Sequence, residues 1–269
     1  MKRIRNLAIF NGICCLIQVA ASYLTQFKVI NSRDVGEISN KYPSLFTPAG
    51  ITFAIWGVIY TGLIAFSIYH IRMAYTKNEQ HPANRDTSRI GALFIINNLV
   101  TTAWLIGWTN EQLLLCVILI LIQLFTLIRI HLRLKIHNAH SSAISKIFTQ
   151  FPLSVYLGWI SIATIANISS WLNAIKWNAW NVTSINWTLT MIAIAVLITL
   201  TVINRKKNVF FGLTVVWALY GIILKRKEID AETYQPIIIV CWAGMAFITF
   251  ACLLGLVRNL MKKRLAHHA

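Results

Sequence analysis

Long apolar stretches alternate with short polar segments along the whole sequence. A helix needs about 20 mostly apolar residues to cross the hydrocarbon core of a bilayer. The Asp and Glu residues all fall between such stretches or at their edges, as expected from the high cost of a charge at bilayer depth. The pattern predicts an all-α, polytopic integral membrane protein with about eight transmembrane helices, at residues 7–27, 51–71, 90–108, 112–132, 148–173, 187–203, 209–224 and 236–257.

Composition agrees with this pattern. Hydrophobic residues make up 57% of the 269 residues and charged residues only 12%, whereas about 25% of a soluble domain is charged. A soluble fold of this length could not bury so much apolar surface, but a lipid bilayer solvates it. The lipid bilayer is therefore the first partner that the sequence predicts.

The basic residues set the expected orientation. The formal net charge is +17, and 18 of the 25 Lys and Arg fall on the cytoplasmic side if the N-terminus is cytoplasmic. An excess of positive charge marks cytoplasmic loops. We therefore expect both termini in the cytoplasm and the protein in a bacterial inner (plasma) membrane. Because the basic residues are spread over loops, with no folded basic domain, nucleic acid is not an expected partner.

The N-terminus allows an alternative topology. A basic start at residues 1–5, an apolar run and the small residues Val19-Ala20-Ala21 resemble a signal peptide. Cleavage would leave seven helices and would not change the assignment of the other spans.

Aromatic and amide side chains share helix faces in three predicted spans. An Asn amide inside the hydrocarbon needs a partner, so it faces either another helix or a ligand. Such faces suit a flat apolar ligand with a few polar edges, whereas hydrogen bonding between helices is the alternative. The residues concerned are Trp56 and Tyr60 in the second span, Asn97, Thr101, Trp104 and Trp108 in the third, and Tyr156, Trp159, Ala163 and Asn167 in the fifth.

The fifth span carries a resemblance to a known family. Its segment 155–167, V-Y-L-G-W-I-S-I-A-T-I-A-N, resembles the fifth-helix signature P-Y-x-x-W-x-x-x-A-T-x-x-N of the TspO/MBR family, the tryptophan-rich sensory or translocator proteins. Val155 stands where the signature has Pro. The loop 43–49 and the start of the second span also resemble the family pattern, with Phe46 in place of a Trp and Ala49 in place of a Pro.

The resemblance implies a TspO-like five-helix bundle at residues 1–174, followed by a three-helix extension at 175–269 whose role is unknown. It also implies a pocket beneath the first loop that binds a porphyrin or a related haem-like tetrapyrrole. Asn98 and Trp104 are less well matched, because six residues separate them where the family has three. The ligand-binding residues implied are Pro48, Trp56, Tyr60, Asn98, Trp104, Tyr156, Trp159, Ala163 and Asn167.

Several readings of the function stay open. The His residues at 70, 131, 137 and 140 fall at inner helix ends or in inner loops, so we expect solvated or interfacial His and tetrapyrrole binding by stacking rather than axial ligation. No metal or catalytic motif is visible, and the leading hypothesis is a receptor, sensor or carrier rather than an enzyme. The alternatives are a secondary transporter of another small molecule and a membrane enzyme that degrades a bound tetrapyrrole. Besides the lipid and the small apolar ligand, a second copy of the chain is a possible partner, in a homodimer.

Overall fold

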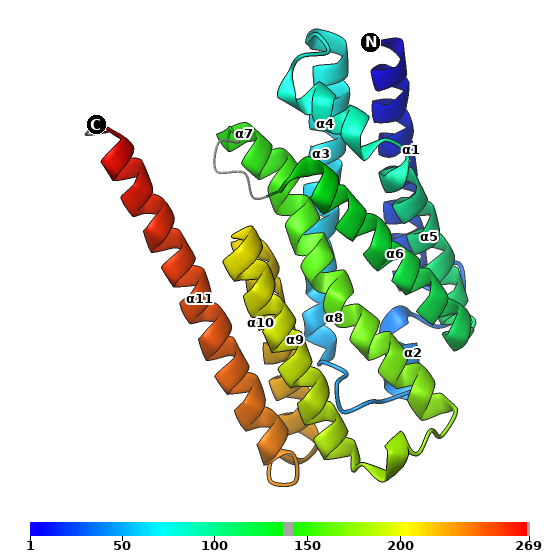
Figure 1. Cartoon of the computed structure of the whole chain (residues 1–269). Helices are drawn as coiled ribbons and strands as arrows, with labels where there is room; N and C mark the ends of the chain where they lie inside the picture. Colours follow the sequence, from blue (N-terminus) through cyan, green and yellow to red (C-terminus); the bar gives the residue numbers. More distant parts are fainter. Residues whose placement is uncertain (137–141, 268–269) are drawn as a thin grey trace. The chain divides into compact units, whose positions relative to one another are not determined.

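The computed structural model describes residues 1–136 and 142–267 (Figure 1). Within these ranges the secondary structure is entirely helical, which confirms the predicted fold class. Among the described residues, seven helical segments are long and apolar enough to span a membrane, and a bent pair of helices is an eighth candidate. The membrane-spanning segments are Lys2–Gln26, Gly50–Thr76, Leu113–Leu134, Ala143–Ala174, Ser184–Lys206, Val209–Asp230 and Gln235–Val257.

These segments correspond to individual helices in Figure 1. Short helices extend two of them at the start: η1 (Gly50–Ala54) before α3, and α7 (Ala143–Ser145) with η2 (Lys146–Gln150) before α8. The long helices are α1 (Lys2–Gln26), α3 (Ile55–Thr76), α6 (Leu113–Leu134), α8 (Phe151–Ala174), α9 (Ser184–Lys206), α10 (Val209–Asp230) and α11 (Gln235–His267).

The third predicted span, residues 90–108, corresponds to a helix with a bend at its start. Helix α4 (Pro82–Ile90) and helix α5 (Leu93–Thr109) meet at an angle of 55°. The His81 side chain caps α4 at its start, and Pro82 occupies the first turn, where it costs no backbone hydrogen bond. Gly91 follows α4 with a φ of +57°, which glycine adopts without the Cβ penalty of other residues. Residues 82–89 fall between the second and third predicted spans, where the sequence pattern predicted no helix, so α4 is an addition that only the structure shows.

The residues group into two compact units. Unit 1 consists of residues 1–44 and 54–177, and unit 2 of residues 45–53 and 178–269. In unit 1, α5 packs against α1 and α6, while α8 packs against α3 and α6. In unit 2, α9, α10 and α11 pack against one another. The predicted division after residue 174 stays a prediction, and the grouping differs from it in placing residues 45–53 with the C-terminal helices.

In unit 1, the loop that follows α1 is tied to the turn between α5 and α6. The carboxylate of Glu111 in that turn accepts hydrogen bonds from Lys41 Nζ and the Tyr42 hydroxyl, each at 2.5 Å, and pairs with Arg33. Trp108 Nε1 donates to the backbone oxygen of Val35 at 3.1 Å. The loop carries the short helix α2 (Val35–Lys41) and is held at both of that helix's ends. We call this set of contacts the Glu111 clamp.

Candidate functional site

Four predicted site residues from α3 and α8 contact one another inside unit 1. We call Trp56, Tyr60, Tyr156 and Trp159 the aromatic group. Trp56 stacks on Tyr60 with ring centroids 5.1 Å apart, and its ring meets Tyr156 and Trp159 edge-on at 6.0 Å and 6.3 Å. The spacing of four residues in α3 and three in α8 places each pair on one helix face. Tyr60, Tyr156 and Trp159 are buried, and Trp56 is half-buried.

Hydrogen bonds connect the tyrosines of this group to two further helices. The Tyr60 hydroxyl donates to Ser22 Oγ of α1 at 2.6 Å. The Tyr156 hydroxyl and Thr101 Oγ1 of α5 are 2.9 Å apart and share a hydrogen bond. Since buried hydroxyls need such partners, these bonds fix the positions of both hydroxyl groups. The aromatic group is therefore positioned by α1, α3, α5 and α8 together.

Asn167 and Trp104 form a separate pair in unit 1. Trp104 Nε1 donates to Asn167 Oδ1 at 3.0 Å, which links α5 to α8. Trp104 also stacks on Trp108, with centroids 5.3 Å apart. In this structure the Asn167 amide oxygen thus has a partner on another helix, the arrangement that the sequence leaves as the alternative to a ligand contact.

The three remaining predicted site residues differ in their surroundings. Asn98 is buried and donates to the Phe94 carbonyl within α5, while its own amide oxygen has no hydrogen-bond partner. Ala163 is half-buried on α8. Pro48 lies in the segment that groups with unit 2, so its place beside the aromatic group stays a prediction.

Sequence reasoning missed a set of buried amides in unit 1. Gln18 of α1 is fully buried, and neither its oxygen nor its nitrogen has a hydrogen-bond partner, although the side chain lies close to the Tyr156 hydroxyl. Gln123 of α6 accepts from Thr101 at 3.1 Å, but its nitrogen is unpartnered. The signal was present in α1, because Asn11, Gln18 and Ser22 recur at helical spacing within an apolar run.

The unpartnered amide atoms of Gln18 and Gln123 are energetically unfavourable in the ligand-free protein. Burying an amide without a hydrogen bond costs roughly 1–3 kcal/mol, judged from protein mutations. A ligand with polar edges, or a water molecule, would supply the missing bonds. The interior around Tyr156 therefore combines aromatic faces with unused donors and acceptors.

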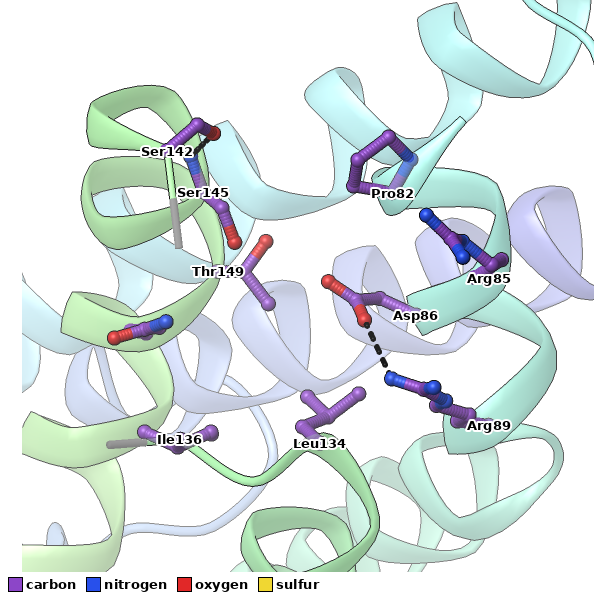
Figure 2. A pocket seen from close by; sticks show the side chains of 10 residues that line it. Pro82, Arg85, Asp86, Arg89, Leu134, Ile136, Ser142, Ser145 and Thr149 are labelled. Atoms are coloured by element: carbon purple, nitrogen blue, oxygen red, sulfur yellow. Dashed lines mark hydrogen bonds and ion pairs between the residues drawn. The ribbon is translucent and has the colours of Figure 1, made fainter. Parts of the chain in front are cut away.

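A polar pocket of about 340 Å³ lies in unit 1 just before the start of α8, where α4 and η2 supply part of its walls (Figure 2). Figure 2 shows Asp86 and Thr149 extending from opposite walls, with Arg89 3.9 Å from the Asp86 carboxylate. Its walls suit a small polar molecule and not a flat apolar one, so it is distinct from the predicted site. It is lined by Pro82, Arg85, Asp86, Arg89, Leu134, Ile136, Ser142, Ser145, Thr149 and Gln150.

His70 lies just behind this pocket, and its predicted solvated or interfacial position was wrong. Its side chain is 2% exposed, with Nδ1 2.9 Å from Thr87 Oγ1 and Nε2 3.0 Å from Thr149 Oγ1. The polar helix α4, which sequence periodicity did not reveal, supplies Thr87 and encloses the ring. Because both ring nitrogens are engaged, His70 offers no free nitrogen to an iron. His137 and His140 lie outside the described residues.

Comparison with protein-family models gives a match over most of the chain. The sequence model of the family described as TSPO-like protein matches residues 8–254. The match runs through α9 and α10 and most of α11, so it also covers most of the region that the sequence resemblance left as an extension. No curated protein and no solved structure matches the chain.

Proposed function

The chain belongs to the TSPO-like protein family, whose members are in general membrane sensors or binding proteins, and from this premise we propose a ligand for it. The proposed ligand is a flat, largely apolar molecule of the porphyrin class, bound inside unit 1 against the aromatic group. The observation that carries the proposal is the convergence of four rings from α3 and α8, held by hydrogen bonds from α1 and α5.

The chemistry of the aromatic group suits such a ligand. Aromatic pairs are worth about 0.5–1.5 kcal/mol beyond the area they bury. Trp56 now meets the rings of Tyr156 and Trp159 edge-on. A bound planar macrocycle would take the place of these ring–ring contacts and make aromatic contacts of its own with the same side chains. The unpartnered atoms of Gln18 and Asn98 would then meet the polar edges of the ligand.

A binding titration tests the proposal. Purified full-length protein is titrated with protoporphyrin IX, and binding is followed by the absorption change of the porphyrin. Trp159→Ala removes one wall of the aromatic group, and we expect its affinity to fall by about tenfold or more, equivalent to about 1.4 kcal/mol.

Trp242→Ala is the matched control, because Trp242 is 47% exposed on α11 in unit 2. It should bind like the unchanged protein. Absence of binding by the unchanged protein, or equal affinity of Trp159→Ala, would refute the proposal.

A further inference from the structure

Residues 45–53, the second half of the first loop, are held by helix α10. The Ala49 backbone N–H donates to the Gly221 backbone oxygen at 2.9 Å. The Trp217 indole Nε1 donates to the Thr52 backbone oxygen, also at 2.9 Å. Trp217 and Gly221 are four residues apart and so share one face of α10. We call residues 45–53 the anchored segment.

The contact is close because residue 221 is glycine. A Cβ atom at this position would lie 2.0 Å from Thr52 Oγ1, 2.8 Å from its Cγ2 and 2.9 Å from its Cβ. Carbon atoms in contact are normally about 3.5–4.0 Å apart, so any larger residue would push the anchored segment away. Thr52 and its neighbours in the segment, Phe46 and Thr47, are buried.

The anchored segment leads directly into the helix that carries half of the aromatic group. Its last residues belong to η1, which continues into α3 at Ile55 as one apolar span. Trp56 is three residues beyond Phe53, and Tyr60 is one turn further. A displacement of the segment is therefore passed along the backbone to the start of α3.

We propose that Gly221 and Trp217 of α10 are positioning residues, which hold the anchored segment so that α3 begins where its aromatic residues can meet a ligand. The C-terminal helices thereby act on ligand binding through the anchored segment. The effect on affinity rests on the function proposed above, whereas the effect on the start of α3 can be measured without any ligand.

A pair of glycine substitutions tests this role in the full-length protein. Gly221→Ala should displace the anchored segment, because the atoms it meets belong to Thr52. Gly244→Ala is the matched control, since its Cβ would lie 2.7 Å from Val196 Cγ2, a clash inside the three-helix packing that does not involve the segment. Trp217→Phe removes the indole donor without adding bulk.

Hydrogen exchange is the first measurement. Gly221→Ala should raise amide exchange about tenfold or more in peptides covering residues 45–53 and 55–62, because local opening controls exchange. Gly244→Ala should leave both peptides unchanged, and Trp217→Phe should give a smaller rise. Unchanged exchange at 45–53 in Gly221→Ala would overturn the anchoring, and a rise confined to 45–53 would overturn the positioning of α3.

Protoporphyrin IX affinity is the second measurement. Gly221→Ala should lower it by about tenfold, and adding Thr52→Gly, which removes all three clashing atoms, should restore most of it. Equal losses in Gly221→Ala and Gly244→Ala would mean that general damage to unit 2 is responsible and would overturn the proposal. If the unchanged protein binds no porphyrin, the proposed function fails, and the exchange data alone decide the positioning role.

Discussion

At the residue scale, some contacts of the proposed site could be predicted from the sequence and others could not. Helical spacing alone places Trp56 over Tyr60, and Tyr156 near Trp159, so the sequence could predict that each pair shares a face. It could not predict that Trp104 would bond to Asn167. That contact depends on the rotation of α5 against α8, which many packed side chains determine together. Nor could it predict that both polar atoms of Gln18 and the amide nitrogen of Gln123 would be buried without a hydrogen-bond partner.

Gln18 provides a residue-scale prediction. Replacing it by Leu removes two unpartnered polar atoms from the interior, so Gln18→Leu should stabilise the ligand-free protein by about 1–3 kcal/mol. The same variant should bind protoporphyrin IX more weakly, because the amide is no longer available to the ligand. Thermal unfolding in detergent and the porphyrin titration measure the two effects.

Gln26→Leu, at the exposed end of the same helix, is the control and should change neither quantity. If Gln18→Leu instead destabilises the protein, the Gln18 amide has a hydrogen-bond partner in the folded protein, and the assignment of free polar atoms is wrong.

At the element scale, the long spans were predictable and the short elements were not. Apolar runs of about 20 residues have few alternatives to a membrane helix, and the helices agree with the runs apart from their ends. Helix α4 is polar, so its sequence contains no apolar run, although Pro82 in its first turn and Gly91 after its last residue are typical of helix boundaries. Residues 45–53 are joined to α10 by a backbone hydrogen bond between Ala49 and Gly221. Such a hydrogen bond does not depend on side-chain identity, so no residue pattern predicts it.

The Glu111 clamp gives an element-scale prediction on pH. The bond from Lys41, followed by that from Tyr42, lowers the pKa of Glu111 from 4.5 to about 2. A carboxyl whose pKa is lower in the folded state adds stability that is complete above the unfolded pKa and is lost as pH falls toward the folded pKa. The clamp should therefore be at full strength above about pH 5 and weaken between pH 4.5 and 2.

Melting temperatures measured across this range in the unchanged protein and in Glu111→Gln test the clamp. The two curves should differ most near neutral pH and converge near pH 2. Parallel curves would show that Glu111 does not titrate with a lowered pKa. Because the Glu111 side chain is only half-buried and its partners Lys41 and Arg33 are exposed, the difference should also shrink in high salt.

At the scale of the whole molecule, the chain is a helical membrane protein whose family match spans both units. Composition and periodicity were sufficient for the fold class, because lipid as solvent leaves helices as the solution for such a sequence. The resemblance in α8 was sufficient for the family. The role of the C-terminal helices could not be predicted, since their contacts with the anchored segment appear only when the chain is folded.

Orientation in the membrane is the whole-molecule prediction. With both termini cytoplasmic, the two ends of α9 lie on opposite sides, Ser184 outside and Lys206 inside. Both residues are exposed and all five native cysteines are buried. A single cysteine introduced at either position therefore shows whether a reagent in the medium can reach that end of α9. In intact cells, a membrane-impermeant maleimide should label Ser184→Cys and leave Lys206→Cys unlabelled until the membrane is opened. The reverse pattern would invert the predicted topology.

The most direct test of the central claim is an experimental structure of the protein with protoporphyrin IX. We expect the macrocycle to lie inside unit 1 against Trp56, Tyr156 and Trp159, with its polar edges toward the Gln18 amide. A macrocycle bound in the polar pocket beside Asp86 and Arg89, or on the lipid-facing surface with the aromatic group unchanged, would contradict it.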